Sequence, residues 1–389
     1  MTPSEKFVSD LCLKSFLPFW SFQSPLGKKT KELCDILVLC NDIIIIISVK
    51  DISPSTNSEE SINYERWVKK AIYDSSEQIC GAERYLNTVD EIVLNDRKTT
   101  VKLPEKSKRK IYRIAVAFGS KPNYPLPTGD FGNGFVHVFD ELSTSVIFNE
   151  LDTIKDFINY LDAKENFFLN KTFFIPREVD FLALYIENSL DFNLPYDTIV
   201  AEYGMWESYC KSKPYLQWQK EIQPSFIWDN LINHLYKHHI KPDTSVEKRE
   251  ELELAVRQMN LEPRINRIEL VMVLENAIKN KVSARMLKPL PGNKYTYVFI
   301  PLTNKNWNKK EKELQLRCVV ARVVNPDVET IIGISLGGGF KGKESVFDVC
   351  FLHVPIIDDD FVKNAKEIQS NLGYFTNTKL SYSKDFRTH

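Results

Sequence analysis

Residues 31–50 read KELCDILVLCNDIIIIISVK, and this stretch decides the fold of the first third of the chain. Residues 33–40 and 43–49 are rich in Ile, Val, Leu and Cys, the composition of buried β-strands. Asn41-Asp42 between them is typical of a two-residue turn. We therefore predict a β-hairpin.

The turn length fixes the register of this hairpin. Counting outward from a two-residue turn places Asp35 opposite Ser48, with Lys50 diagonally beyond on the same face. Facing Cβ atoms lie about 5 Å apart and diagonal ones about 7–8 Å, so these three side chains should form one patch. Glu32 has the opposite parity, which pairs it with Asp51 on the other face unless a bulge shifts it.

An acid and a lysine on neighbouring strands have a chemical use. A carboxylate can hold Mg²⁺, which prefers oxygen ligands. The metal lowers the pKa of a bound water, and an ammonium group can orient that water or stabilise charge on a phosphate. The alternative is an edge strand whose terminal charges only contact solvent.

Asp35, followed after twelve residues by Ser48-Val49-Lys50, resembles the motif of the PD-(D/E)xK (restriction-endonuclease-like) nuclease superfamily. The resemblance covers roughly residues 1–120. It implies an α-β-β-β-α-β core, with a first helix over residues 3–15 and a first strand over Phe16–Phe22. It also implies that Asp35 binds Mg²⁺ or Mn²⁺ and that Lys50 is catalytic.

The resemblance is incomplete, because Ser48 stands where the superfamily carries its third-strand acid. Two acids are candidates for the missing metal ligand: Glu32, and Glu5 on the first helix. Loss of activity is the other explanation. If the site is active, Ser48 would assist catalysis.

A long amphipathic helix is predicted over residues 58–86, with capping residues at Asn57-Ser58-Glu59-Glu60. Its apolar or small positions recur every three or four residues: Val68, Ile72, Ser75, Ile79, Ala82 and Leu86. Gln78 lies at the edge of this face. The resemblance gives this glutamine a role near the metal or the scissile phosphate, and a structural amide is the alternative.

A basic run precedes the strand predicted at Ile111–Gly119. Its charged residues are Lys106, Lys108, Arg109 and Lys110. Basic runs are usually solvated faces, but beside a nuclease core this one would contact the phosphates of DNA or RNA.

Three regions are predicted along the chain. Residues 1–165 form the nuclease-like domain, which ends with a strand at Gly134–Phe139 and a helix at Leu151–Leu161. Residues 166–283 are mainly helical, with helices over 244–260 and 266–281. Residues 284–389 form an α+β domain with a mixed sheet. The fold class is therefore α/β (α+β).

Four strands are predicted in the last region: Tyr295–Pro301, Leu314–Val324, Glu329–Leu336 and Ser345–Val354. A helix capped by Asp358-Asp359-Asp360 follows and ends near Gly373. Residues 337–343 match G-x-x-x-x-G-K, but Glu344 replaces the Ser or Thr of a P-loop, and a strand follows where a P-loop needs a helix. A hairpin loop is the better interpretation.

Composition limits the partners and the location. The formal net charge is −1, which excludes a global positive field, so any nucleic-acid surface must be local. The seven cysteines form no C-x-x-C pair, which argues against a zinc site or a disulfide framework. The lack of a disulfide framework favours a reducing cytoplasm as the location. The longest purely apolar run near the start, Ile43–Ile47, is far short of a membrane span, so we expect no membrane contact.

The sequence thus favours a metal-dependent nuclease that hydrolyses phosphodiester bonds in DNA or RNA. By analogy of fold, it would belong to a prokaryotic antiviral defence system, with the middle and C-terminal regions contacting a second copy or a partner protein. The alternative is a catalytically degenerate nuclease fold that acts as a nucleic-acid-binding or scaffold component.

Overall fold

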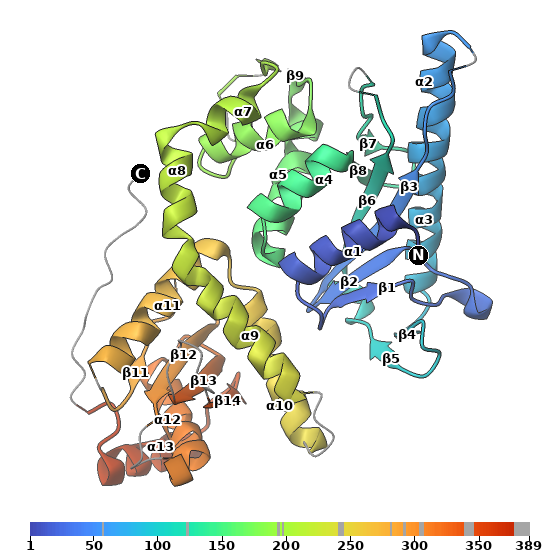
Figure 1. Ribbon diagram of the computed structural model, residues 1–389. Helices are drawn as coiled ribbons and strands as arrows, with labels where there is room; N and C mark the ends of the chain where they lie inside the picture. The colour runs from blue at the N-terminus through green and yellow to red at the C-terminus, as the bar shows by residue number, and fades with distance from the viewer. Residues whose placement is uncertain are drawn as a thin grey trace. The chain divides into compact units, whose positions relative to one another are not determined.

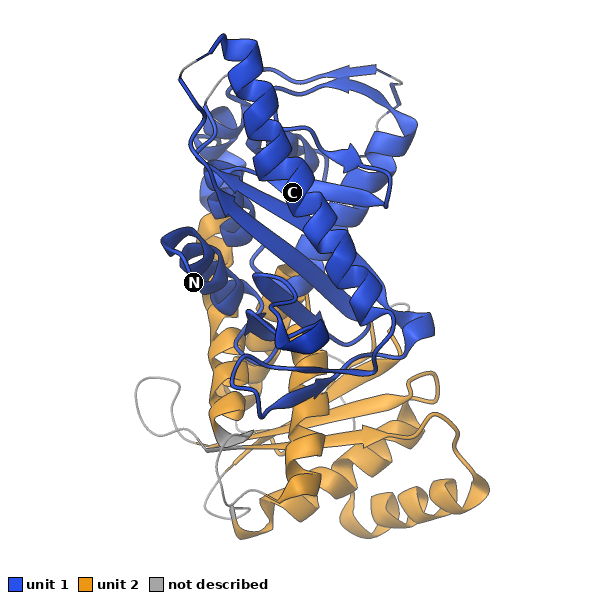
Figure 2. Cartoon of the chain, turned by 90° about the vertical axis from the view of Figure 1, so that its right-hand side faces the viewer, with its two compact units in different colours: residues 1–217 blue, residues 218–389 orange. Residues whose placement is uncertain are grey.

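The computed structural model describes residues 1–56, 58–121, 124–192, 195–196, 198–239, 245–280, 282–290, 293–302, 307–337 and 346–376. The protein is of mixed α/β class, and it divides into two compact units, Met1–Gln217 and Trp218–His389 (Figure 2). The helical middle region predicted from the sequence is thus divided between the two units. No helix in the described residues is long and apolar enough to cross a membrane.

The predicted hairpin and its register are confirmed. Strand β2, Ile36–Cys40, pairs antiparallel with β3, Ile43–Asp51, and Cys40 faces Ile43 across the two-residue turn. The side chains of Ile44 to Ile47 are fully buried. Burial of each stabilises the fold by about 1.5–3 kcal/mol, which makes this hairpin the centre of the first unit.

The hairpin belongs to a six-stranded sheet with the order β1-β2-β3-β6-β8-β7. Strand β6 pairs parallel with β3, and β8 pairs parallel with β6. The remaining strands of the sheet are β1 Ser21–Gln23, β6 Lys110–Phe118, β7 Gly129–Asp130 and β8 Phe135–Phe139. The first strand is therefore shorter than predicted and starts later, because the chain leaves the first helix through a turn.

Helices cover both faces of this sheet (Figure 1). One face packs against a continuous helix made of α2 Glu60–Val68, a π-helical turn at Lys69–Tyr73 and α3 Asp74–Leu86. The long predicted helix is thus confirmed, with Glu59 at its N-cap; Asn57 lies outside the described residues. Helix α1, Pro3–Ser15, matches its predicted range.

The rest of the first unit is mostly helical. The helix predicted at Leu151–Leu161 corresponds to α5, which begins later, at Ile154, and continues to Asn170. Helix α4 and the hairpin formed by β4 and β5 were not predicted. The bounds are α4 Glu141–Glu150, α5 Ile154–Asn170, α6 Glu178–Glu187, α7 Met205–Cys210, β4 Glu91–Val93, β5 Thr100–Lys102, β9 Thr172–Phe174 and β10 Thr198–Val200. Helix α8, Lys213–Glu221, spans the division between the units.

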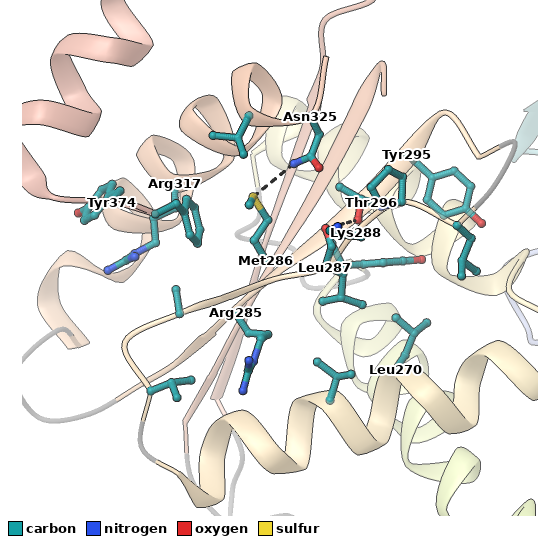
Figure 3. A pocket seen from close by; sticks show the side chains of 18 of the residues that line it. Leu270, Arg285, Met286, Leu287, Lys288, Tyr295, Thr296, Arg317, Asn325 and Tyr374 are labelled. Atoms are coloured by element: carbon teal, nitrogen blue, oxygen red, sulfur yellow. Dashed lines mark hydrogen bonds between the residues drawn. The ribbon is translucent and has the colours of Figure 1, made fainter. Parts of the chain in front are cut away.

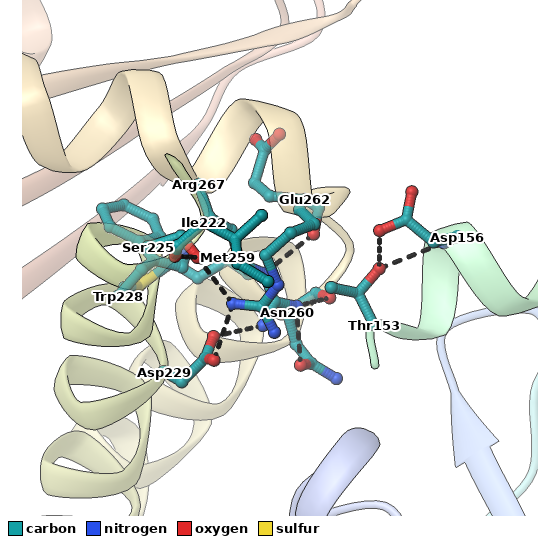
Figure 4. A network of polar contacts seen from close by, with 11 residues as sticks. Thr153, Asp156, Ile222, Ser225, Trp228, Asp229, Met259, Asn260, Glu262 and Arg267 are labelled. Carbon is teal, nitrogen blue, oxygen red and sulfur yellow. Dashed lines mark hydrogen bonds and ion pairs between the residues drawn. The ribbon is translucent and has the colours of Figure 1, made fainter. Parts of the chain in front are cut away.

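Three helices of the second unit are joined by a buried ionic network (Figure 4). Asp229 on α9 forms ion pairs with Arg264 and Arg267 on α11, and Arg267 also donates to the carbonyl oxygens of Asn260 and Glu262. The helices are α9 Phe226–His239, α10 Val246–Asn260 and α11 Arg264–Lys279. Removing one member would leave a buried charge without its partner.

The second unit also contains a four-stranded sheet with the order β11-β12-β13-β14. Its strands are β11 Arg285–Met286, β12 Tyr295–Pro301, β13 Thr330–Gly337 and β14 Val346–His353. The predicted strand Leu314–Val324 is wrong, because these residues lie in helix α12, Lys310–Val324. Leu314, Cys318 and Ala321 recur at helical spacing and pack on the sheet.

The glycine-containing loop after β13 falls largely outside the described residues. Strand β14 follows it and pairs antiparallel with β13, where a P-loop requires a helix. Asp358 caps α13, Asp359–Leu372, by accepting a hydrogen bond from the Phe361 amide, and Gly373 ends it in the left-handed conformation. Both helix signals in this segment are confirmed.

Candidate functional site

Asp35 is held beside β3 where the hairpin register puts it. One oxygen of its carboxylate accepts a hydrogen bond of 2.6 Å from the backbone amide of Val49. Ser48 is buried and Lys50 is half-buried, and both alternate onto the face covered by α3. The structure therefore brings Asp35, Ser48 and Lys50 to one part of the sheet.

Helix α3 adds Gln78 to this site. The Ser48 hydroxyl donates a hydrogen bond of 3.2 Å to the Gln78 side-chain oxygen. Gln78 is exposed at the surface of the helix. Serine at position 48 thus has a defined partner, and the same contact orients the glutamine.

The pKa of Asp35 is raised above its usual value, mainly because the carboxyl group is partly buried. The negative charges of Glu5 and Glu32 raise this pKa further, while the Val49 amide and the Lys50 ammonium lower it. Glu5 and Glu32 therefore add to the cost of ionising Asp35, beyond the effect of burial.

This pKa shift predicts how stability depends on pH. A raised pKa means that the folded protein holds the proton more tightly, so the contribution of Asp35 is present below pH 3.8 and is lost as pH rises through the folded pKa. At pH 7 in EDTA, Asp35→Asn should therefore melt at a higher temperature than wild type, since asparagine keeps the acceptor for Val49. Thermal melts at pH 4, 5.5 and 7 measure the difference.

Asp96 supplies a control of the opposite sign. Hydrogen bonds from Thr99 and Lys98 lower its pKa to about 2, so the contribution of Asp96 is present above pH 3.8 and is lost toward pH 2. Asp96→Asn should therefore lower the melting temperature at pH 7. If Asp35→Asn also lowers it at pH 7, the pKa of Asp35 is not raised in the folded protein.

The two candidate replacement acids lie in different settings. Glu5 is part of a capping box, in which its carboxylate accepts from the Thr2 amide at 2.8 Å. Glu32 is exposed and forms an isolated bridge with Leu26, so the predicted pairing of Glu32 with Asp51 is wrong. The hairpin pairing ends at Ile36, before it reaches Glu32.

Two contacts at the end of β3 that were not predicted from the sequence hold the site together. Asp51 accepts a hydrogen bond from the Ser4 hydroxyl, which ties α1 to the residue after Lys50. Gly119, at the end of β6, has a φ of +79°, and a Cβ there would lie 2.7 Å from the carbonyl oxygen of Ile52. A glycine after a buried strand is the signal that could have indicated this close approach.

The basic run lies at the opposite end of the sheet from Asp35. Lys110 pairs with Ile43 at one end of β3, whereas Lys50 near the other end pairs with Ala117. Lys50 follows Ile43 by seven residues, so the strand carries the two lysines about 23 Å apart. The Arg109 guanidinium donates to the carbonyl oxygens of Leu86, Val89 and Pro104, and only 2% of its side chain is exposed. Arg109 therefore has a structural role, and the run does not border the candidate site.

A different group of lysines lies on the Asp35 side of the sheet. The loop between β1 and β2 carries Lys28, Lys29 and Lys31, all exposed, and none forms an ion pair with another described residue. Lys31 precedes Asp35 by four residues, which limits the distance between their Cα atoms to about 14 Å. This basic loop was not singled out from the sequence.

The backbone of the basic loop is strained at its tip. Lys29 and Thr30 have φ angles of 57° and 58°, in the left-handed region that non-glycine residues rarely adopt. Such residues cost about 1–3 kcal/mol each and concentrate at functional sites.

The candidate metal ligands at this site are the carboxylate oxygens of Asp35, Glu5 and Glu32, and oxygen is the ligand type that Mg²⁺ and Mn²⁺ prefer. Within the described ranges, no group of three or more His, Cys, Asp or Glu side chains is positioned to hold a metal ion. Mg²⁺ commonly binds through one or two carboxylates together with waters and substrate phosphates, and a site centred on Asp35 fits that pattern.

Comparisons with known proteins give no relative. The chain matches no protein-family model, no curated protein and no solved structure. Its function must therefore be inferred from the site itself.

Proposed function

We propose that the protein is a metal-dependent nuclease that hydrolyses phosphodiester bonds in DNA or RNA. The observation that carries the proposal is the convergence of Asp35, Ser48, Lys50 and Gln78 on one face, with Asp35 fixed by the Val49 amide. The order of helix, three antiparallel strands, helix and parallel strand also agrees with the core that the resemblance implies.

Each residue has a role in the proposed reaction. Asp35 would hold Mg²⁺ or Mn²⁺, with Glu32 or Glu5 as a further oxygen ligand; the bound metal supplies a water of lowered pKa and charge stabilisation. The Lys50 ammonium would orient the attacking water and stabilise negative charge on the phosphate oxygens. Gln78, positioned by Ser48, would donate a hydrogen bond to the phosphate.

A cleavage assay tests the proposal directly. Labelled plasmid, single-stranded DNA and RNA are incubated with the protein in Mg²⁺, Mn²⁺ or EDTA, with site variants alongside. Cleavage that requires the metal and disappears in the variants supports the proposal and identifies the substrate. Cleavage that persists in the variants would place the activity elsewhere.

The basic loop is the better candidate for binding the substrate phosphates. Each strand of a duplex carries one phosphate per 3.4 Å along the axis, so the limit of about 14 Å between the Cα atoms of Lys31 and Asp35 corresponds to at most roughly four nucleotides. The ammonium groups of Lys28, Lys29 and Lys31 would therefore contact phosphates close to the scissile bond. A nucleic acid bound at Asp35 would reach the basic run at residues 106–110 only if the nucleic acid extended along the whole length of β3.

Two triple variants of equal charge compare these surfaces. Replacing Lys28, Lys29 and Lys31 by alanine should weaken nucleic-acid binding by roughly tenfold to a hundredfold at 50 mM salt. The slope of log affinity against log salt concentration should fall by the amount expected for the loss of up to about three phosphate contacts. Replacing Lys106, Lys108 and Lys110 by alanine should change binding less than threefold. Fluorescence anisotropy with a labelled 20-nucleotide oligomer in EDTA measures both, and equal losses in the two variants would contradict the assignment to the loop.

Ser48 favours a second candidate, a nuclease fold that binds nucleic acid without cleaving it. Its hydroxyl occupies the position of the missing acid and bonds to Gln78, an arrangement that needs no metal. This protein would bind an oligonucleotide equally well in Mg²⁺ and EDTA and would cleave none of the three substrates.

A further inference from the structure

The second unit contains a cavity of about 1010 Å³, and polar groups in its wall already have partners (Figure 3). The Arg317 guanidinium pairs with Glu313 at 2.8 Å, and the Asn325 amide donates to the Met286 sulfur at 3.3 Å. These contacts select no class of ligand. Strand β10 of the first unit differs, because some of its backbone groups face solvent without a hydrogen bond to any described residue.

Strands β9 and β10 form a sheet of only two strands. They pair in parallel, and their inner face packs on α5, where the centre of the Phe173 ring lies 4.3 Å from that of Phe168. The outer face consists of four exposed residues: Thr172, Phe174, Thr198 and Val200. Two-stranded sheets are marginal in water, since independent stability needs three or more strands. This sheet would therefore gain from a further strand.

The free edge of β10 presents the backbone groups of Thr198 and Val200. The Ala201 amide donates to the carbonyl oxygen of Phe174 on β9 at 3.0 Å. Backbone groups of successive residues in a strand point to opposite sides, so Ile199 shares the direction of Ala201, while Thr198 and Val200 point away from β9. Both residues are exposed, and no other described residue bonds to these outward groups.

The edge strand of the other unit's sheet, β14, is protected. Lys248 on α10 donates to the Val349 carbonyl oxygen at 2.9 Å, and Glu251 accepts from the Phe351 amide at 3.0 Å. Proteins block sheet edges in this way, or with charged residues and proline, because an open edge pairs with another chain. Strand β10 reads Thr-Ile-Val and carries neither a charge nor a proline. Its open edge therefore favours pairing with another strand.

A second copy of β10 would satisfy the outward groups completely. In an antiparallel pair, two facing residues exchange both of their hydrogen bonds. With a twofold axis at Ile199, Thr198 of each copy faces Val200 of the other, so every outward donor meets an outward acceptor. The strand is thus complementary to itself.

Charge does not oppose this pairing. The formal net charge of the chain is −1, so two copies do not repel each other strongly. The charged residue that follows β10, Glu202, would lie about 20 Å from its equivalent in the other copy. That separation is about twice the Debye length at 0.1 M salt, so the two carboxylates would be screened from each other.

The exposed apolar area matches a weak dimer. Four large side chains on or beside the two strands are 68% to 71% exposed: Phe174, Tyr196, Val200 and Tyr203. If pairing covers roughly 100–150 Å² of each, two copies together bury about 1,000 Å². This area is about the minimum for a specific interface.

We infer that two copies of this protein associate through β10. The joined sheet would have four strands in the order β9-β10-β10-β9, with the central pair antiparallel about Ile199. The inference does not depend on the proposed nuclease activity.

Sedimentation velocity of the full chain from about 1 to 200 µM, in a reducing buffer that prevents disulfides between copies, tests this inference. We expect a dimer with a dissociation constant of about 1–100 µM, because interfaces near this size are weak. Exchange of the Thr198 and Val200 amide hydrogens should be slower at the highest concentration than at the lowest. A chain that stays monomeric throughout this range overturns the inference and leaves the edge to a different partner.

Val200→Pro removes an outward N–H group and should weaken the dimer at least tenfold. Proline is tolerated on a strand edge, and the pairing with β9 uses the groups of Ile199 and Ala201 instead. Val200→Thr keeps the N–H group and the branched shape, so it should change the dissociation constant less than threefold. Equal losses in the two variants would mean that the side-chain face, and not the edge, forms the contact, which contradicts the inference.

Two lysine substitutions locate the axis even if Val200→Pro does not fold. Thr198→Lys would place two ammonium groups on diagonal positions about 7–8 Å apart and should weaken the dimer at least tenfold. Thr172→Lys adds the same charge at the paired position of β9, where the two copies lie about 14 Å apart, and should change it less than threefold. A dimer that tolerates Thr198→Lys, or that loses as much with Thr172→Lys, does not form through β10.

Discussion

Lys50→Met should reduce the rate of metal-dependent phosphodiester cleavage by about 10²–10³-fold while leaving the fold intact. The ammonium group is the cation next to Asp35, and removing one such electrostatic contact from a transition state costs roughly that factor. Asp35→Asn should lower cleavage at least as far, because the amide retains the hydrogen bond from Val49 but loses the charge that holds the metal. Single-turnover kinetics at saturating Mg²⁺ measure both.

A lysine at the other end of the sheet is the matched control. Lys110→Met removes an exposed ammonium beside Ile43 and should change the rate by less than twofold. Equal losses in Lys50→Met and Lys110→Met would show a general effect of charge rather than a site. Full cleavage by Asp35→Asn would exclude Asp35 as the metal ligand.

Ser48→Asp separates a weak nuclease from a degenerate one. The new carboxylate would face Asp35 directly, so like charges should destabilise the protein in EDTA and Mg²⁺ should restore its stability. A gain in cleavage by this variant over an inactive wild type would indicate that the missing acid is what limits the site.

The hairpin could be predicted to the residue from its turn. Both faces of β3 are buried and carry isoleucine, so the hydrophobic pattern does not select a register, whereas the two-residue turn does. That is why Asp35, Ser48 and Lys50 meet as expected. The position of Glu32 could not be predicted in the same way, because it precedes the paired part of β2, and there the turn no longer constrains the chain.

The position of the basic run illustrates what the sequence could not provide. Its residues precede β6 in the chain, but whether they lie near Asp35 depends on the direction in which β6 pairs with β3. The parallel pairing sets Lys110 beside Ile43 and carries the run to the far end of the sheet. The lysines at the site come instead from a loop whose strained tip has no sequence signature beyond its charge.

Helix α12 was mistaken for a strand for a reason that its packing explains. Residues 314–324 contain a run of valines, and short apolar runs of this kind fit either a strand or a buried helix. The deciding feature is the spacing of Leu314, Cys318 and Ala321, which recur every three or four residues and pack on the sheet as one face of a helix. Gly333 in β13 lies beneath this face, and the absence of a side chain there lets Leu314 and Cys318 approach the sheet closely.

Gly333→Ala should therefore destabilise the second unit by about 1–3 kcal/mol, which lowers the midpoint of thermal unfolding by roughly 4–10 °C. A Cβ at this position would lie 2.6 Å from the Cys318 sulfur and 2.8 Å from a methyl group of Leu314, both on the buried face of α12. Neither atom can withdraw without moving the helix off the sheet. Gly81→Ala is the control, because a Cβ there contacts only the end of Arg84 at 3.8 Å. That change should be neutral or stabilise α3 by up to about 1 kcal/mol.

A double-mutant cycle assigns the cost of Gly333→Ala to this contact. Cys318→Ala removes the nearest atom, so the combined variant should be more stable than the sum of the two single effects by about 1 kcal/mol. Urea unfolding of the four proteins gives the coupling free energy. Additive effects, or a Gly333→Ala variant as stable as wild type, would mean that α12 does not depend on close approach at Gly333. Coupling of the expected sign would show that α12 packs on β13 through this close approach.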